Sequence, residues 1–215
     1  MVEKDLSPET VEELRSILAE NKEFFNQPIE VLKPRHYRLI EMITTYAGDS
    51  LTTSVLELGC SGGEFVDYLM GQGYNAEGVD VNEKAIERSN KIYLHYGDVT
   101  CLDNVVGKRT FDLIVATGVF NTGTQIEYLF GNELNMAKKG KVMISPKHGK
   151  AALENIEQIL RSAFKHLIPS GFLMTVDNIS PGDYTAFSPE TALSIGYTVM
   201  HHAKQEAILQ KPLNK

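Results

Sequence analysis

The sequence predicts an α/β fold with a mostly parallel, doubly wound sheet. A short apolar run ends in a glycine-rich turn at residues 55–63. Strand and helix patterns then alternate from residue 53 onward, and two short strand patterns close the chain. Alternation of this kind gives a parallel sheet with right-handed crossovers and helices on both faces. We therefore expect one sheet of seven strands, ending in a C-terminal antiparallel hairpin and preceded by N-terminal helices.

Hydrophobic patterning and turn residues place the individual elements. Strands are predicted at 55–58, 76–80, 92–96, 111–116, 171–176, 197–202 and 207–210. Helices are predicted at 64–70, 83–91, 151–167 and 188–194. The run 141–145 is an alternative fifth strand. We prefer 171–176, because the amphipathic helix before it supplies the crossover that a parallel strand needs, with Pro169-Ser170-Gly171 ending that helix.

Two helices are expected before the sheet begins. Ser7 at the N-cap and Pro8 at the first helical position start one of them. The second is predicted over 35–46. We accordingly divide the chain into an N-terminal helical lid, residues 1–50, and a main domain, residues 51–215, with an insertion at about 119–150.

Composition narrows the classes of protein to consider. The chain has 215 residues, of which 42% are hydrophobic, enough for one α/β domain and a modest accessory segment. No apolar run approaches the roughly 20 residues of a membrane span, and the acidic N-terminus does not resemble a signal peptide. Cys60 and Cys101 are too few for a disulfide framework or a zinc site. We expect a cytoplasmic protein without a metal, and the net charge of −7 disfavours nucleic acid as a partner.

The stretch from Val55 to Gly63 carries the strongest indication of a ligand. It reads Val-Leu-Glu-Leu-Gly-Cys-Ser-Gly-Gly, and a helical pattern follows at once. A strand, a tight glycine turn and a helix open a nucleotide-binding βαβ unit. Glycines let a ligand approach the backbone, and the amide groups that start the next helix point toward it.

Five segments in order resemble the class I S-adenosylmethionine-dependent methyltransferases, over about Leu51 to Gln210. Ser61 stands where the first motif of that family often has its middle glycine. The matching segments are 57–63, 78–82, 97–99, 111–116 and 163–172. The resemblance implies a Rossmann-like methyltransferase fold, methyltransferase activity and S-adenosylmethionine as the cofactor.

The resemblance also implies which residues form the cofactor pocket. They are Glu57, Gly59, Cys60, Ser61, Gly63, Asp80, Val81, Asp98, Val99 and Thr117. A carboxylate at Asp80 can accept two hydrogen bonds from ribose hydroxyls, and Asp98 can accept from the adenine amino group. Glu57 complements the cationic amino group of the methionine part. Both residues have a purely structural alternative. Asp80 could be an acid at the N-terminus of a helix, and Asp98 could be an acid in a turn.

Two other functions compete with this interpretation. A nicotinamide-dependent dehydrogenase would need Gly-x-Gly-x-x-Gly, whereas the last position here is Glu64, which would repel a pyrophosphate. Glu57 is also unsuited to an anionic ligand and suited to a cationic sulfonium. The second alternative is a cofactor-binding, methyltransferase-like protein that serves as a regulatory or interaction module.

The acceptor is less determined than the cofactor. Residues 117–121 lack the Pro-Pro-aromatic motif of one type of amino methyltransferase, and no nucleophilic cysteine for base-carbon methylation lies near them. The segment 119–150 is an insertion that carries an apolar patch and five lysines. It is either a lid for a small, anionic or aromatic acceptor or a solvated insertion. His148, whose pKa range suits a general base, and Tyr37 are the candidate catalytic residues.

Overall fold

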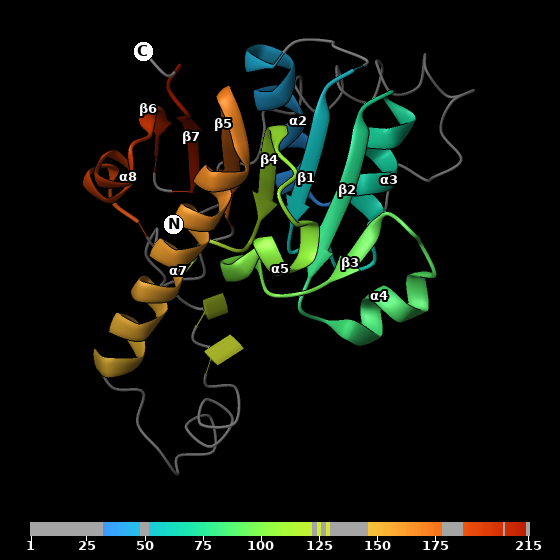
Figure 1. The fold of residues 1–215 in the computed structure, drawn as a ribbon, viewed down its shortest axis with the longest axis horizontal. Helices are drawn as coiled ribbons and strands as arrows, with labels where there is room; N and C mark the ends of the chain where they lie inside the picture. The colour runs from blue at the N-terminus through green and yellow to red at the C-terminus, as the bar shows by residue number, and fades with distance from the viewer. Residues whose placement is uncertain are drawn as a thin grey trace.

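Seven strands form one sheet in the order β3-β2-β1-β4-β5-β7-β6 (Figure 1). This computed structural model describes residues 32–47, 52–121, 124–125, 128–129, 146–177, 187–203 and 205–213. The strands are β1 (Ser54–Leu58), β2 (Asn75–Asp80), β3 (Leu94–Tyr96), β4 (Phe111–Thr117), β5 (Leu167–Val176), β6 (Thr198–His202) and β7 (Glu206–Gln210). The predicted α/β class and the number of strands are confirmed.

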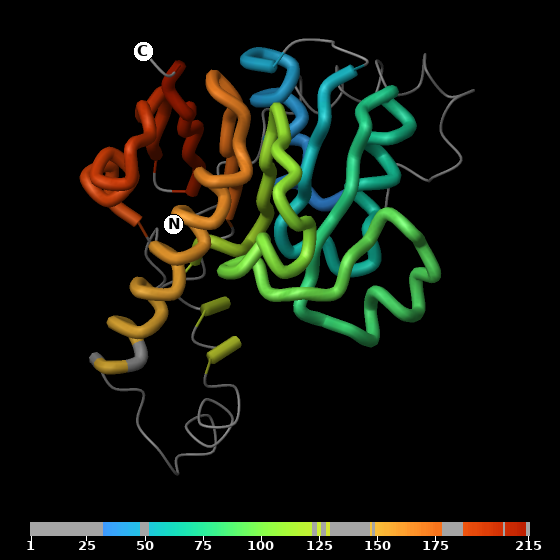
Figure 2. Tube along the Cα trace, viewed as in Figure 1, coloured from blue at the N-terminus to red at the C-terminus, as the bar shows by residue number. Residues whose placement is uncertain are grey.

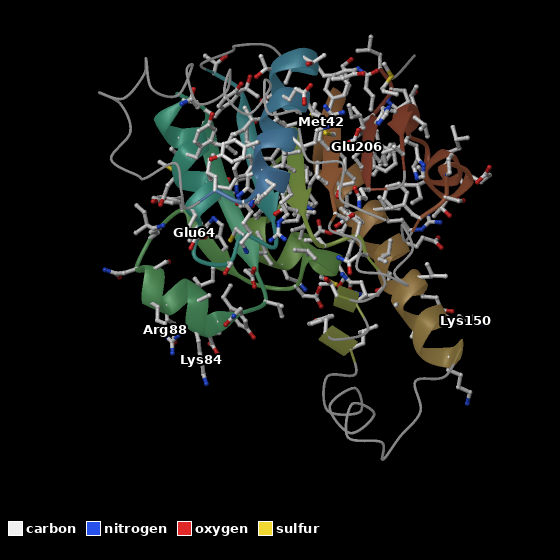
Figure 3. All side chains as sticks on the ribbon, turned by 180° about the vertical axis from the view of Figure 1, so that it is seen from behind. Met42, Glu64, Lys84, Arg88, Lys150 and Glu206 are labelled. Atoms are coloured by element: carbon white, nitrogen blue, oxygen red, sulfur yellow. The ribbon has the colours of Figure 1, made fainter. Side chains whose placement is uncertain are left out.

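Helices cover both faces of this sheet. They are α2 (Pro34–Tyr46), α3 (Glu64–Gly71), α4 (Glu83–Ser89), α5 (Asp103–Val106), α7 (Pro146–His166), α8 (Pro189–Ile195) and the short 3-10 helix η3 (Val99–Cys101). Seen from behind, α2 lies in front of the central strands, while the long α7 lies on the opposite side (Figure 3). The predicted first helix, around 7–18, and the run 141–145 lie outside the described residues. None of the helices in the described part of the chain could cross a membrane.

The pairing of the strands explains where a ligand can bind. Strand β1 pairs in parallel with both β2 and β4, and β4 pairs in parallel with β5. The pairs β5–β7 and β6–β7 are antiparallel, so the predicted C-terminal hairpin is confirmed. Strand order reverses between β1 and β4, and ligands of open α/β sheets bind outside the carboxyl ends of the strands at such a point.

Alternate residues of the strands belong to two separate apolar clusters, one on each face of the sheet. On β1, Val55 packs with residues of α2 and α3, whereas Leu56 and Leu58 pack with residues of α7 and α8. All three side chains are fully buried. Burial on both faces is why these strands read as continuous apolar runs in the sequence.

Helix α2 is part of the core. Its Leu39, Met42 and Ile43 are buried in the cluster on the α3 side of the sheet. Arg38 donates to Glu206 of β7, which is labelled in Figure 3, through Nε and Nη2, both at 2.7 Å. This paired geometry is among the stronger ion-pair arrangements, and it fastens α2 to the C-terminal hairpin.

The junction between α7 and β5 differs from the prediction. The helix ends at His166, and β5 begins directly at Leu167, before the predicted stop at 169–171. Leu167 pairs with Phe111 and Phe172 pairs with Leu113, so the intervening residues form a bulge within the strand. Backbone hydrogen bonds from Ser170 to Lys211 and from Lys211 to Gly171 hold this bulge in the sheet. Pro and Gly therefore mark a bulge here, a position that both residues tolerate.

Candidate functional site

A cavity of about 200 Å³ lies at the carboxyl ends of β1, β2 and β4. In the tube view, the short described stretches 124–125 and 128–129 lie beyond these strand ends (Figure 2). Six of the ten predicted cofactor residues line the cavity, namely Gly59, Asp80, Val81, Asp98, Val99 and Thr117. The other lining residues are Gly118, Val119, Thr124, Gln125, Tyr128, Asn155 and Ile159. The predicted residues thus meet at the place where the strand order reverses.

The glycine loop has a backbone that other residues would strain. Gly59 and Gly63 have φ angles of +74° and +80°. A Cβ at Gly59 would lie 2.6 Å from a methyl group of Val119, and one at Gly63 would lie 2.5 Å from Leu94. The loop therefore needs glycine for its conformation and for its packing.

Packing and hydrogen bonds hold the remaining residues of the loop in place. Cys60 is buried against Gly78, and burial raises the pKa of its thiol, so it is an unreactive packing residue. The Lys91 ammonium donates to the Gly62 carbonyl at 2.8 Å and to Asp67 of α3 at 2.5 Å. Lys91 thus holds the loop against the helix that follows it. The sequence analysis missed this residue, because a surface lysine in a helix-to-strand connection carries no distinguishing pattern.

Asp80 joins the glycine loop to the start of α4. Its Oδ2 accepts from the Ser61 amide and its Oδ1 from the Asn82 amide, both at 2.7 Å. Asn82 in turn caps α4 by accepting from the Ala85 amide at 3.2 Å. The structural role considered for Asp80 is therefore present. Each carboxylate oxygen has a second lone pair, so the same group can also accept from a ligand hydroxyl.

Asp98 has partners on both carboxylate oxygens. Its Oδ1 accepts from the amide and the hydroxyl of Thr100, both at 2.8 Å. Its Oδ2 accepts from the Tyr128 phenol at 3.1 Å. The insertion thus reaches the strand end that the resemblance assigns to adenine, a contact that no local sequence pattern indicates.

Glu57 is a buried carboxyl group with an unsatisfied oxygen. Its side chain is 2% exposed, and Oε2 has no hydrogen-bond partner within the described residues. Burial, followed by the charges of Glu64 and Asp80, raises the pKa of Glu57 to about 8. A buried acid in this condition gains from a nearby positive charge, which would favour its ionised form.

Arg35, at the start of α2, was not singled out from the sequence. Its Nε is buried and has no hydrogen-bond partner in the described part of the chain. A Cβ on Gly118 would lie 3.7 Å from the guanidinium carbon, so the guanidinium group lies beside the end of β4. Burial lowers the pKa of Arg35, and the charges of Asp177 and Glu57 oppose that shift. Arg35 thus places a positive charge near the acids Glu57 and Asp177.

His36 faces β4, but it is a poor proton acceptor. Its Nδ1 accepts from the Lys33 amide at 3.1 Å, and its Nε2 lies 3.3 Å from the Thr117 hydroxyl. The ring stacks on Phe65 with 4.9 Å between centroids. Burial and the neighbouring Arg35 lower its pKa to about 3. At neutral pH it is therefore an uncharged ring that positions Thr117.

The two candidate catalytic residues are placed less clearly. Tyr37 packs against the cluster on the α3 side and is not among the described residues that line the cavity. His148 belongs to α7, but its side chain lies outside the described residues. A catalytic role for either residue stays a prediction.

Two side-chain amides form one wall of the cavity. Asn155 of α7 donates to the Gln125 carbonyl oxygen at 2.6 Å, and Gln125 donates to the Val119 backbone carbonyl at 2.6 Å. Asp177 fixes the neighbouring backbone by accepting from the Phe120 amide at 3.0 Å. Burial raises the pKa of Asp177 to about 6. Gln125 and Asn155 thus give their part of the cavity a neutral, polar lining.

A family model described as a methyltransferase domain matches residues 12–202. The chain belongs to this family of methyltransferases. It uses S-adenosylmethionine as cofactor, in agreement with the resemblance read from its five segments. No curated protein matches the sequence.

Several solved structures share the fold at low identity. A TehB-like SAM-dependent methyltransferase from Corynebacterium glutamicum has a TM-score of 0.52 and 15% identity, with 96% of this chain and 97% of that chain covered. The sugar N-methyltransferase KedS8 from Streptoalloteichus has a TM-score of 0.56 and 15% identity, with 84% and 87% covered. NodS from Bradyrhizobium japonicum, in complex with S-adenosyl-L-homocysteine, has a TM-score of 0.53 and 17% identity, with 94% and 98% covered.

The residues present fit this cofactor. The orphaned carboxyl oxygen of Glu57 suits a cationic ligand, and Gly59, which lines the cavity, lets a ligand approach its backbone. Acceptor oxygens of Asp80 and Asp98 border the same cavity. Within the described residues, no group of three His, Cys, Asp or Glu side chains is placed to hold a metal ion.

Proposed function

We propose that this methyltransferase modifies a small acceptor that enters between the end of β4 and the segment 119–150. The observation that carries the proposal is the buried carboxyl group of Glu57 beside the glycine turn, whose Oε2 has no partner within the described residues, with Asp80 and Asp98 at the next two strand ends. When bound, the cofactor supplies an electrophilic methyl group. The protein's own part is to bind both molecules, hold them in line and exclude water.

The cofactor roles proposed for the cavity residues follow from their hydrogen-bonding capacity. Asp80 accepts from the ribose hydroxyls, and Asp98 accepts from the adenine amino group. Val81 and Val99 also line the cavity, and an apolar ring can pack against them. Thr117 presents its backbone and hydroxyl at the end of β4, where His36 orients the hydroxyl.

The segment 119–150 is proposed to form a lid over the acceptor. Its described residues Gln125 and Tyr128 already line the cavity, which supports this role over that of a solvated insertion. Helix α2 packs into the core, so any lid function of the N-terminal unit is assigned to the residues before Pro34. The lid would exclude water and orient the acceptor.

Different features of the cavity and of the segment 119–150 favour two classes of acceptor. The excess of lysines in 119–150 supports an anionic or aromatic acceptor, although Lys147 and Lys150 are exposed and Lys150 lies 3.7 Å from Glu154. The neutral wall of Gln125 and Asn155 instead suits an acceptor rich in hydroxyl or amino groups. KedS8 is a sugar N-methyltransferase, which makes amino sugars a reasonable second class to test.

A labelled-methyl transfer screen tests this function. The protein is incubated with methyl-labelled S-adenosylmethionine and panels of phenols, carboxylates, amino sugars and RNA. We expect labelled product from a small-molecule panel, and less of it from a folded Asp80→Ala variant when the cofactor is limiting. Cofactor binding without transfer to any panel would favour a regulatory module. Failure of the wild-type protein to bind S-adenosylhomocysteine in calorimetry would contradict the proposal.

A further inference from the structure

The peptide group between Gly62 and Gly63 has the least restricted backbone of the glycine loop. Neither flanking residue carries a Cβ, so the peptide plane rotates more easily there than elsewhere in the loop. Ser61, just before it, holds a φ of +50°, which is unfavourable for a residue with a side chain. The Gly63 amide donates to the Cys60 carbonyl at 2.8 Å. This bond fixes one end of the peptide group, and the carbonyl end needs a partner of its own.

Lys91, in the connection between α4 and β3, supplies the partner for that carbonyl. Its ammonium group donates to the Gly62 oxygen at 2.8 Å and to Asp67 of α3 at 2.5 Å. The Lys91 side chain is 24% exposed, so the contact is partly shielded from water. A hydrogen bond from a charged donor in such a place is stronger than one between neutral groups.

Two neighbours of Lys91 support the same part of the loop. The Tyr93 phenol donates to the second carboxylate oxygen of Asp67. Burial and this bond raise the pKa of Tyr93 to about 12, so the phenol keeps its proton at neutral pH. Leu94 occupies the space beside Gly63, where an added Cβ would lie 2.5 Å from a Leu94 methyl group. Residues 91–94 therefore support the loop from the α4–β3 connection.

The loop carries this support to the cavity through Ser61 and Asp80. Lys91 is not among the described residues that line the cavity, whereas Gly59 and Asp80 are. The Ser61 amide donates to Asp80 Oδ2 at 2.7 Å. A rotation of the adjacent Gly62 backbone would displace this amide, and with it the carboxylate that it holds. Lys91 thus acts on the cavity through the backbone and without touching a ligand.

We propose that Lys91 is a positioning residue for the cofactor. Its ammonium group fixes the Gly62 carbonyl, so that the glycine loop and Asp80 have their binding arrangement before the cofactor arrives. A preordered loop loses less conformational entropy on binding, and the affinity rises accordingly. The inference rests on the proposed use of this cavity for S-adenosylmethionine. It adds a residue outside the cavity to those that determine the affinity.

Calorimetry with Lys91 variants tests this role. In a Lys91→Met variant we expect S-adenosylhomocysteine to bind about tenfold more weakly, because a charge-assisted hydrogen bond to the loop is lost. Lys91→Arg keeps a charged donor and should recover most of the affinity. The fragment 5′-methylthioadenosine keeps the adenosine and lacks the amino-acid end of the cofactor. Its affinity should fall by a similar factor in Lys91→Met, because Asp80 is expected to hold the ribose.

Two control variants separate this role from a general loss of stability. Tyr93→Phe removes a bond to Asp67 and leaves the contact between Lys91 and Gly62 in place. It should lower the melting temperature and keep the affinity for S-adenosylhomocysteine within about twofold of wild type. Lys84→Met makes the same change of charge at an exposed position on α4, labelled in Figure 3. It should alter neither quantity.

Hydrogen exchange of residues 59–64 gives a second measurement on the same proteins. Exchange in the ligand-free state should be faster in Lys91→Met than in wild type or Tyr93→Phe, and S-adenosylhomocysteine should slow it in all three. Lys91→Gln replaces Lys91→Met if the latter does not fold, and it should weaken binding in the same direction.

The outcomes that overturn the proposal are distinct from a failure of the proposed function. Wild-type affinity in a folded Lys91→Met variant would overturn it, as would an equal loss of affinity in Tyr93→Phe. Weaker binding of S-adenosylhomocysteine alone, with 5′-methylthioadenosine unaffected, would exclude the route through Asp80. If the wild-type protein binds neither ligand, the proposed function itself fails.

Discussion

The phenol of Tyr128 donates a hydrogen bond to the carboxylate of Asp98, with 3.1 Å between the two oxygen atoms. Tyr128 belongs to the insertion after β4, and Asp98 follows β3. The contact therefore closes one side of the cavity with a residue from the proposed lid. It also occupies the carboxylate oxygen that the adenine amino group would approach.

A Tyr128→Phe variant is expected to bind 5′-methylthioadenosine a few-fold more tightly than wild type. The phenol hydrogen bond must otherwise be broken or shared when adenine reaches Asp98, and a single such bond is worth about 1 kcal/mol. Calorimetry measures the change, with Tyr96→Phe as a control because Tyr96 is exposed at the end of β3. Weaker binding would show that the phenol supports the bound adenine and does not compete with it.

An Asp80→Ala variant is expected to bind S-adenosylhomocysteine more weakly by about 1–3 kcal/mol, the range for hydrogen bonds to a charged group. It should also lower the melting temperature, because the Ser61 and Asn82 amides lose their acceptor. Affinity is measured by calorimetry and stability by thermal unfolding. Reduced stability with an unchanged dissociation constant would assign Asp80 a structural role alone.

A Gly59→Ala variant is expected to lose cofactor binding while keeping most of its fold. The new Cβ would lie 2.6 Å from Val119, in a backbone with φ of +74°. Gly107→Ala is the matched control, since Gly107 has φ of +65° but nothing within 4 Å of the added atom. Both variants carry the backbone strain, on the order of 1–3 kcal/mol. Equal affinities for S-adenosylhomocysteine in the two variants would show that the close contact at Gly59 has no bearing on binding.

The strand ends were predictable because each candidate residue there follows an apolar run. Glu57 and Asp80 could be placed at one edge from sequence alone, since parallel strands end together. The bulge in β5 was not predictable, because a proline and a glycine after an amphipathic helix also form an ordinary helix stop. Only the pairing with Phe111 and Leu113 distinguishes the two.

Contacts between distant segments could not be read from periodicity. Arg35 lies on an amphipathic helix, and the pattern of that helix does not say which strand end its first turn will reach. Tyr128 and Lys91 were equally hidden, since each acts on a residue about 30 positions away. The sequence thus predicts the cofactor residues at the strand ends. The structure adds residues from distant segments that lie beside them.

Glu57 makes the stability of the ligand-free protein depend on pH. Its pKa in the folded protein, about 8, is above its ordinary value, so the folded state holds a proton that the unfolded state has already released. That contribution to stability is present at acidic pH and is lost as pH rises through about 8. The advantage in melting temperature of a Glu57→Gln variant over wild type should therefore grow from about pH 6 to about pH 9. A constant difference across this range would contradict the raised pKa.

The same proton should make cofactor affinity depend on pH. A cationic ligand group beside Glu57 favours the ionised carboxylate, so binding below about pH 8 must release the proton that Glu57 holds in the free protein. The affinity for S-adenosylhomocysteine should therefore rise from about pH 6 to about pH 8, by up to about tenfold per unit. The affinity for 5′-methylthioadenosine, which lacks the ammonium group, should change much less, and Glu57→Gln should remove the dependence for both ligands. Calorimetry in buffers of different ionisation enthalpy measures the released proton directly, and the absence of proton release from the wild-type protein would exclude Glu57 as the partner of the ammonium group.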